Sequence, residues 1–219
     1  MFLSRMAINV ARRQARFLLG SPQAMHAAVL SSFAPNVPTE TGEGRVLWRV
    51  DRSEDHAVWL YVVSPEAPDM THLIEQAGWQ TQGAWETRDY NPFLARITAG
   101  QQWAFRVMAN PVRTVTEEGI GKRRGHVTAS QQQNWFLDRA EPNGFFVPRT
   151  EGGEPDVIVS NRDGKSFRRG DSTVTLATAQ FDGRLEVCNA EKLRHLLTHG
   201  LGRAKGYGCG LATLAPVQR

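Results

Sequence analysis

The residues best suited to chemistry gather in the twelve-residue stretch GLGRAKGYGCGL, from Gly200 to Leu211. Five of the twelve are glycines, and Arg203 and Lys205 lie among them. Glycine is used where the backbone takes a positive φ or approaches a ligand closely. Successive backbone N–H groups in such a loop can form a concave anion site, which nearby cations reinforce. The pattern predicts a phosphate-binding loop, with close approach of the backbone at Gly206 and Gly208.

Other interpretations of this stretch stay open at this point. It lacks the GxxxxGK[ST] order of a mononucleotide phosphate loop, and it is not a GxGxxG dinucleotide motif. A helix C-cap followed by a tight turn would use the same glycines. Composition alone therefore leaves two alternatives, a site for nucleic-acid phosphate and a purely structural turn.

Histidine is the second residue type that can carry chemistry here. His195 and His199 have the i,i+4 spacing of metal ligands, but no HExxH pattern or carboxylate cluster accompanies them. We therefore predict no metal site, and interpret this pair as cations near a helix C-terminus. His26 falls on the shoulder of the apolar face of a predicted helix, where a half-buried core histidine is the plain interpretation. The alternative is catalysis, because imidazole titrates near neutral pH and exchanges protons without a metal.

Positive charge is concentrated in the second half of the chain. Residues 1–100 hold 9 Lys and Arg against 10 Asp and Glu, whereas residues 101–219 hold 17 against 12. This imbalance favours a polyanionic partner, although ordinary surface charge would give similar counts. The basic clusters are Arg12 with Arg13, then Lys122, Arg123 and Arg124, and finally Arg162, Lys165, Arg168 and Arg169. The last group lies in a predicted hairpin tip, which is either an RNA contact or a solvated turn; the middle group either faces RNA or lies in a mobile loop.

The glycine-rich stretch resembles the C-terminal signature of the Cas6 endoribonucleases, which are RAMP-type CRISPR RNA-processing proteins. It is most similar to the Cas6e branch of type I-E systems. Further segments resemble the same family, in the family's order and over most of the chain. They are FLSRMAINV at 2–10, RVLWRVD at 45–51, FRVMANPVRTV at 105–115, GKRRGHV at 121–127 and DGRLEV at 182–187.

The resemblance implies a metal-independent endoribonuclease that needs no cofactor and cuts the repeat hairpins of CRISPR precursor transcripts. A ribose 2′-OH would attack the adjacent phosphate and leave a 2′,3′-cyclic phosphate and a 5′-OH. The enzyme would stay bound to its RNA product as a subunit of the Cascade complex. Two alternatives remain, a noncatalytic subunit that binds the RNA hairpin and a RAMP-like structural subunit.

The resemblance also assigns roles to residues. His26 is the only histidine of the first predicted helix, where the family carries its catalytic histidine. Cas6e proteins commonly have a tyrosine three residues earlier, but this chain has Gln23, which cannot transfer a proton. Gln23 and Lys205 are therefore only accessory candidates, for a hydrogen bond to phosphate and for charge stabilisation. The basic residues named above, with Arg203, Gly206 and Gly208, are expected to bind RNA.

The first part of the chain is predicted to position His26. Residues 2–10 form a strand, and a basic connector containing Arg12, Arg13 and Arg16 follows. Ser21 and Pro22 then begin a helix that runs to about Phe33. Strands at 45–51, 57–63 and 84–90 and a short helix at 69–78 complete a βαββαβ unit, which is ferredoxin-like.

A weaker repeat of this unit is predicted after a link at 91–100. The α+β fold class, with two tandem ferredoxin-like units and helices packed on antiparallel sheets, relies on the resemblance for its second unit. We expect an N-terminal domain at 1–95 with the catalytic helix, and a C-terminal domain at 101–219 with the RNA-binding hairpin and glycine-rich loop. The predicted elements are strands at 102–109, 156–160 and 173–181, helices at 130–140 and 190–199, and a tight hairpin turn at Asp182-Gly183, and residues 206–214 close the unit.

The composition limits the other possibilities. Apolar residues make up 41% of the chain, which is enough for a packed core, and no run approaches the ~20 apolar residues of a membrane span. The N-terminus has no secretory pattern, because its apolar run is short and its arginines follow that run. Cys188 and Cys209 have no metal-ligand companions and are expected to be reduced thiols. We expect a cytoplasmic protein with no membrane partner.

Overall fold

The computed structural model describes residues 1–53, 55–79, 85–117, 120–169 and 172–217, and the chain divides into two compact units. The first unit holds Met1–Arg96, Thr198–Gly200 and Lys205–Leu211, and the second holds Ile97–Leu197, Leu201–Ala204 and Ala212–Arg219. The division after Arg96 falls within the predicted link. The segments at 198–200 and 205–211 group by their contacts with the first unit, although the sequence analysis placed them in a C-terminal domain.

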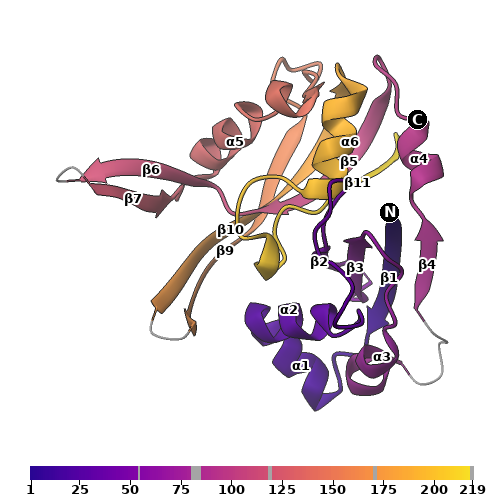
Figure 1. Cartoon of the computed structure of the whole chain (residues 1–219). Helices are drawn as coiled ribbons and strands as arrows, with labels where there is room; N and C mark the ends of the chain where they lie inside the picture. The colour runs from indigo at the N-terminus through magenta and orange to yellow at the C-terminus, as the bar shows by residue number, and fades with distance from the viewer. Residues whose placement is uncertain (54, 80–84, 118–119, 170–171, 218–219) are drawn as a thin grey trace. The chain divides into compact units, whose positions relative to one another are not determined.

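The first unit is built on a four-stranded antiparallel sheet in the spatial order β2-β3-β1-β4 (Figure 1). Its strands are β1 (Phe2–Ile8), β2 (Leu47–Arg52), β3 (Val58–Ser64) and β4 (Glu86–Asp89). Its helices are α1 (Arg13–Gly20), α2 (Pro22–Leu30), α3 (Thr71–Ala77) and α4 (Asn91–Ala95). Apart from the additional helices α1 and α4, this order is the predicted βαββαβ unit.

Two predictions for the first unit were wrong in detail. The basic connector after β1 is largely the helix α1, whose Ala15 and Leu18 are buried. The predicted link at 91–100 contains the short helix α4, which begins with an Asn-Pro pair. In both segments the polar residues or the proline do not predict a helix. The helix forms because burying one or two apolar side chains stabilises it more than the local sequence disfavours it.

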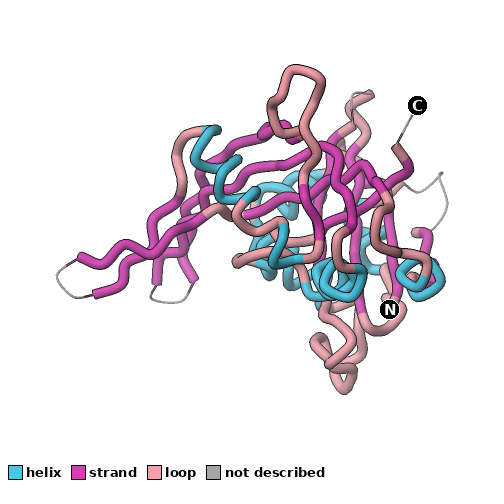
Figure 2. The backbone as a smooth tube through the Cα atoms, turned by 90° about the horizontal axis from the view of Figure 1, so that it is seen from above, coloured by secondary structure: helices cyan, strands magenta, loops and turns pink. Residues whose placement is uncertain are grey.

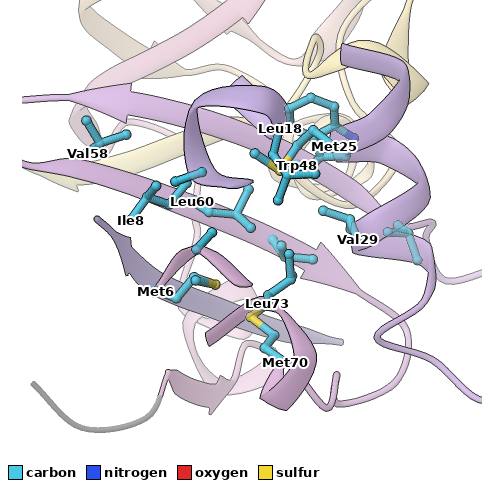
Figure 3. Packing of buried hydrophobic residues seen from close by; sticks show 14 residues of the cluster. Met6, Ile8, Leu18, Met25, Val29, Trp48, Val58, Leu60, Met70 and Leu73 are labelled. Carbon is cyan, nitrogen blue, oxygen red and sulfur yellow. The ribbon is translucent and has the colours of Figure 1, made fainter. Parts of the chain in front are cut away.

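The core of the first unit lies between the sheet and helices α1, α2 and α3. Figure 3 shows Met25 and Val29 of α2 packed near Leu18 of α1 and Trp48 of β2. All four side chains are nearly fully buried. Burying such a side chain is worth roughly 1.5–3 kcal/mol, so these contacts fix the position of α2. The next step along α2 after Met25 is His26, which is only half-buried.

The second unit contains a five-stranded antiparallel sheet in which β5 and β10 are central. Its spatial order is β11-β5-β10-β8, and β9 also pairs with β10. The strands are β5 (Gln102–Ala109), β8 (Phe145–Phe146), β9 (Val157–Arg169), β10 (Ser172–Val187) and β11 (Ala212–Pro216). The helices are α5 (Ala129–Leu137) and α6 (Ala190–His199), with the 3₁₀ turn η1 (Glu141–Asn143); a further 3₁₀ turn, η2 (Lys205–Tyr207), belongs to the first unit.

The aromatic residues of the second unit form its core. Phe136 of α5 stacks on Phe181 of β10 and on Phe105 of β5, with ring centroids 4.8 and 5.2 Å apart. Two caps begin its helices as their sequences indicate. Thr128 forms a capping box with Gln131 at α5, and the Asn189 side chain accepts a hydrogen bond from the Lys192 N–H at α6.

Two long hairpins extend from the second unit. The β9–β10 hairpin includes the predicted basic tip, while β6 (Val112–Glu117) and β7 (Ile120–Gly125) form a second hairpin, where no strands are predicted from the sequence. Figures 1 and 2 show both hairpins running out beyond the helices of this unit. The sequences VRTVTE and IGKRRG contain few apolar residues, so their alternation is too weak to predict strands.

The predicted turn at Asp182-Gly183 was also wrong. Both residues lie inside β10, where Gly183 pairs with Phe105 of β5 and with Val157 of β9. A Cβ on Gly183 would lie 2.1 Å from the Asp156 carbonyl oxygen. The glycine therefore serves a close approach of two backbones within a strand and does not make a turn.

These elements support the fold class, and two tandem ferredoxin-like units account for them. No helix among the described residues is both long and apolar enough to cross a membrane.

Candidate active site

The helix α2 carries His26, and its start is well defined. The Ser21 side chain accepts a hydrogen bond from the Ala24 N–H at 3.2 Å, and Pro22 occupies the first helical position, as predicted. The buried residues Pro22, Met25 and Val29 face the core. His26 follows Met25 by about 100° around the helix, so its ring leaves the core at the edge of the helix.

Trp48 of β2 fixes the direction of the His26 ring. Its indole Nε1 donates a hydrogen bond to Nδ1 of His26 at 3.4 Å. An indole N–H can only donate, so Nδ1 is the acceptor, and the neutral ring carries its hydrogen on Nε2. Trp48 is only 4% exposed, which makes this donor a fixed part of the fold.

The glycine-rich loop closes around these two side chains. A Cβ added to Gly206 would lie 3.1 Å from Nε2 of His26, so this glycine leaves room at the reactive nitrogen. Gly208 has a φ of +80°, and a Cβ there would lie 2.7 Å from the Trp48 ring. The loop therefore meets both ends of the Trp48–His26 pair through glycines, as close backbone approach requires.

Lys205 begins the η2 turn beside this pair and brings a cation to the site. Burial and, to a lesser degree, the charge of Arg45 lower the pKa of the Lys205 ammonium, while Glu40 acts in the opposite direction. Arg45 itself forms an ion pair with Glu40, with 3.2 Å between Nη1 and Oε2. Two cations that share one carboxylate leave a net positive charge in a partly desolvated place, which suits a phosphate.

A buried ion pair anchors the end of the loop. Arg49 is 2% exposed, and its Nε and Nη2 donate to the two carboxylate oxygens of Asp51 at 2.6 and 2.8 Å. Its Nη1 donates to the Leu211 carbonyl at 2.8 Å, so one guanidinium ties strand β2 to the last residue of the loop. The same strand carries Trp48. Arg49 thus positions the loop and is not placed to meet a ligand.

The other residues of the first unit that were predicted to take part in catalysis or RNA binding have different surroundings. Gln23 is exposed on α2, one turn before His26. Arg12 donates to the carbonyls of Ile74 and Gly78 at 3.3 and 3.1 Å, and also to that of Glu75. Its guanidinium therefore caps the C-terminal end of α3. Arg13 is exposed at the start of α1.

The remaining candidates belong to the second unit. Arg162 donates to Oε1 of Gln132 at 2.8 Å and to the Val127 carbonyl, so it is tied to the start of α5. Lys165 lies 3.7 Å from the Asp163 carboxylate, and Arg124 and Arg203 are exposed. The side chains of four candidates, Lys122, Arg123, Arg168 and Arg169, lie outside the part of the chain that the structure describes. RNA binding by all of these residues stays a prediction.

Among the described residues, no group of three or more His, Cys, Asp or Glu side chains could hold a metal ion. The cluster instead combines an imidazole, an indole N–H, an ammonium and a glycine-rich backbone. Such a set can hold a phosphate and transfer a proton to it.

Two members of this cluster were not predicted from the sequence. In the sequence, Trp48 belongs only to a segment that resembles the family. Arg45 lies at the start of the strand predicted at 45–51, whereas β2 begins at Leu47. A buried tryptophan at residue 48 is an ordinary core residue by pattern. Its N–H can be assigned to His26 only when the positions of α2 and β2 are known, so no local signal could have found it.

Known proteins with similar sequences are CRISPR-associated. A family model described as CRISPR associated protein matches residues 1–216. The CRISPR-associated endoribonuclease Cse3 of Thermus thermophilus is 30% identical over 223 residues, which cover 99% of this chain and 100% of that protein. The Cascade subunit CasE of Escherichia coli is 29% identical over 130 residues, covering 56% of this chain and 62% of CasE.

Solved structures give the same result. The structure of the CRISPR endoribonuclease Cse3 bound to a 19-nucleotide RNA is similar with a TM-score of 0.82 and 27% identity, over 99% of this chain and 100% of that one. Thermus thermophilus Cse3 bound to an RNA representing a pre-cleavage complex gives a TM-score of 0.80 and 28% identity, over 98% of each chain. The full-length family match and the full-length relative agree, and the chain belongs to the CRISPR-associated protein family, in its Cas6e (Cse3) branch.

Proposed function

We propose that this protein is an endoribonuclease that cleaves the repeat hairpins of CRISPR precursor transcripts without a metal ion, and that His26 is its essential proton-transfer residue. The observation that carries the proposal is the arrangement of His26 between Trp48 and Gly206, with Lys205 in the same loop. The relatives named as endoribonucleases, one of them bound to RNA before cleavage, support the same activity.

The reaction is an attack by the ribose 2′-OH on the adjacent phosphorus. The bond from phosphorus to the 5′ oxygen of the next nucleotide breaks, which leaves a 2′,3′-cyclic phosphate and a 5′-OH. The 2′-OH loses a proton, and the departing 5′ oxygen gains one. Two proton transfers are therefore needed, and either can be assisted by a side chain.

Trp48 orients the His26 ring so that Nε2 is the nitrogen beside Gly206. Because the indole occupies Nδ1, Nε2 carries a hydrogen in the neutral ring, and it also carries one in the protonated ring. Nε2 is the atom beside Gly206, where a bound phosphate would lie. His26 in its protonated form therefore acts as the acid for the departing 5′ oxygen. Protonation of Nδ1 opens the bond to Trp48, which at 3.4 Å is long and weak.

Lys205 stabilises the charge that develops on the phosphate. Its ammonium is already partly desolvated and lies near the cation Arg45, so a phosphate at the loop relieves an unfavourable arrangement. Preorganised cations of this kind can lower the barrier strongly, because the site does not need to reorganise during the reaction. Gln23, in place of a tyrosine, is left with at most a hydrogen bond to the RNA.

The RNA hairpin itself is held mainly by the second unit. The β9–β10 hairpin carries Lys165, Arg168 and Arg169, and the β6–β7 hairpin carries Lys122, Arg123 and Arg124. Basic side chains on protruding hairpins suit A-form RNA, which proteins recognise mostly by its shape and backbone. The N-terminal domain at 1–95 would supply catalysis and the C-terminal domain from 101 the binding surface, with residues 205–211 serving the catalytic domain.

The product is expected to stay bound, so that the protein enters a Cascade complex with its RNA. The Escherichia coli relative is itself named a Cascade subunit. The reaction would take place in the cytoplasm, where precursor transcripts are made.

Cleavage of a repeat RNA by the full-length protein in the presence of a chelator tests this function. The expected products carry a 2′,3′-cyclic phosphate and a 5′-OH, and a single 2′-deoxy nucleotide on the 5′ side of the scissile phosphate should block the cut. Binding without cleavage of the all-ribose RNA would establish the alternative, a noncatalytic hairpin-binding subunit, which the replacement of tyrosine by Gln23 favours.

A further inference from the structure

The second unit contains a cationic cavity that the cleavage reaction does not use. Its volume is about 600 Å³, and its lining comes from β6, from the start and the outer side of α5, and from Arg203. Figure 1 shows α5 beside the base of β6 and β7. Cavities of 300–1,000 Å³ are typical of small-molecule sites, so this one is large enough for a nucleotide.

Three arginines dominate the charge of the cavity. Arg113 comes from β6, Arg139 from just after α5, and Arg203 from the glycine-rich stretch, while Asp138 is the one carboxylate among the lining residues. The balance is positive even with His126 neutral. Arginine suits phosphate because its planar guanidinium donates two parallel hydrogen bonds to neighbouring oxygens.

Arg139 is held in place before any ligand binds. Its Nη1 donates to the Trp135 carbonyl at 2.8 Å, and its guanidinium lies 4.2 Å from the centroid of the Trp135 ring. Burial lowers the pKa of the Arg139 guanidinium, with Asp138 acting in the opposite direction. A cation fixed in a partly desolvated position has a smaller entropic cost when it binds an anion.

The cavity wall also includes the rings of His126 and Trp135. Nδ1 of His126 and Nε1 of Trp135 are buried and make no hydrogen bond within the described part of the chain. Burial, together with the charges of Arg113 and Arg139, lowers the pKa of His126, and Asp138 opposes this. Both nitrogens are shielded from solvent, so the cavity offers a ligand the charge of its arginines and not these two atoms.

We propose that this cavity is a nucleotide-binding site in which Arg113, Arg139 and Arg203 hold the phosphate group. The cavity lies wholly within the second unit, and His26 and Lys205 belong to the first. The site therefore does not depend on whether the chain cleaves RNA. The phosphate could come from an unpaired nucleotide of a bound RNA or from a free mononucleotide.

Calorimetric titration of the full-length protein with uridine, UMP and the dinucleotide UpU tests the site. UMP or UpU should bind, and uridine, which lacks the phosphate, should not. Tighter binding of UpU than of UMP identifies an internucleotide phosphate, as in RNA, and the reverse order identifies a free mononucleotide. Absence of saturable binding by both phosphate ligands up to about 10 mM, which corresponds to roughly 3 kcal/mol of binding free energy, would overturn the proposal.

Four variants locate the binding, two in the cavity and two outside it. Arg113→Gln and Arg203→Gln should each weaken it about tenfold, the usual effect of losing a charge-assisted hydrogen bond. The matched control Arg149→Gln removes an exposed arginine of the same unit that bonds to the Gly153 carbonyl, away from the cavity, and should leave binding unchanged. Equal losses in these three variants would remove the cavity from the site. So would binding that is lost in Lys205→Gln and kept in Arg113→Gln, because the ligand would then occupy the first-unit loop.

Discussion

The indole Nε1 of Trp48 donates to Nδ1 of His26 at 3.4 Å, while Nε2 of the same ring lies beside Gly206. One nitrogen of the imidazole is thus used by the fold, and the other faces the glycine-rich loop. This division determines which atom can meet a substrate. It also predicts which tautomer the neutral ring adopts, because an indole can only donate.

The tautomer of His26 can be measured directly. The ¹⁵N chemical shifts of the imidazole in the neutral wild-type protein should show hydrogen on Nε2 and none on Nδ1. Trp48→Phe keeps an aromatic ring but removes the donor, so the two tautomers should become more evenly populated. An Nδ1–H tautomer in the wild type would contradict the hydrogen bond from Trp48 to Nδ1. Cleavage by Trp48→Phe should fall less than cleavage by His26→Ala, since only one weak hydrogen bond is lost.

The two central glycines of the loop should differ in what they cost when replaced. Gly206→Ala places a Cβ 3.1 Å from Nε2 of His26, so cleavage should slow while thermal stability stays close to that of the wild type. Gly208→Ala forces alanine into a φ of +80° and against the Trp48 ring, which should destabilise the protein by roughly 1–3 kcal/mol.

Gly20→Ala is the matched control for both glycine variants, because nothing lies within 4 Å of its Cβ position. Cleavage rates and thermal unfolding of the three variants separate a crowded active site from a damaged fold. If Gly206→Ala cleaved at the wild-type rate, the ring of His26 would not face the substrate at this position.

Lys205 should contribute to RNA affinity through one phosphate. Lys205→Gln should weaken binding of repeat RNA and reduce the slope of log affinity against log salt by about one. Arg52→Gln, which removes an exposed arginine at the end of β2, is the control and should change neither quantity. Binding isotherms at several salt concentrations measure both. An unchanged slope in Lys205→Gln would place the phosphate elsewhere.

The β9–β10 hairpin should carry more of the RNA affinity than other basic sites of its unit. Charge reversal of Arg168 and Arg169 together should weaken binding of the repeat hairpin strongly, because it replaces attraction to phosphate with repulsion. Arg149→Glu is the control for a reversed charge in the same unit. Arg49 would be a poor control, since breaking its buried pair with Asp51 would cost about 3–5 kcal/mol of stability. Equal losses at both positions would exclude the hairpin from the RNA site.

Local patterns were enough to predict the elements that carry the site, but not how its parts meet. Ser21 and Pro22 predict the start of α2, and the apolar residues at 45–51 and 57–63 predict β2 and β3. The contact of Gly206 with His26 joins residues 180 positions apart, and no local pattern encodes it. Trp48 is a similar case. A tryptophan buried in the core and a tryptophan whose N–H donates to a histidine look the same in the sequence.

Glycine was the residue type most open to misinterpretation. In the loop, Gly206 and Gly208 let the backbone lie close to His26 and Trp48, while the predicted approach to a phosphate stays a prediction. At Gly183 the same residue in an Asp-Gly pair indicated a turn, whereas the structure uses it to let β9 and β10 approach within a sheet. A glycine in the sequence indicates only that a side chain would not fit at that position. At Gly183 the cause is the backbone of β9, which is distant in sequence and cannot be identified from the local pattern.

We expect Nε2 of His26 to protonate the departing 5′ oxygen, and a substrate with sulfur in place of that oxygen is the sharpest test of this role. Thiolates are far better leaving groups than alkoxides and need no proton. On the all-oxygen RNA in chelator, His26→Ala should cleave about 10²–10⁴-fold more slowly than the wild type, with nearly unchanged RNA affinity. On the 5′-thio substrate the variant should recover to within about tenfold of the wild type, because the missing acid is no longer needed. An equal loss on both substrates, or a requirement for magnesium in the wild type, would contradict this role for His26.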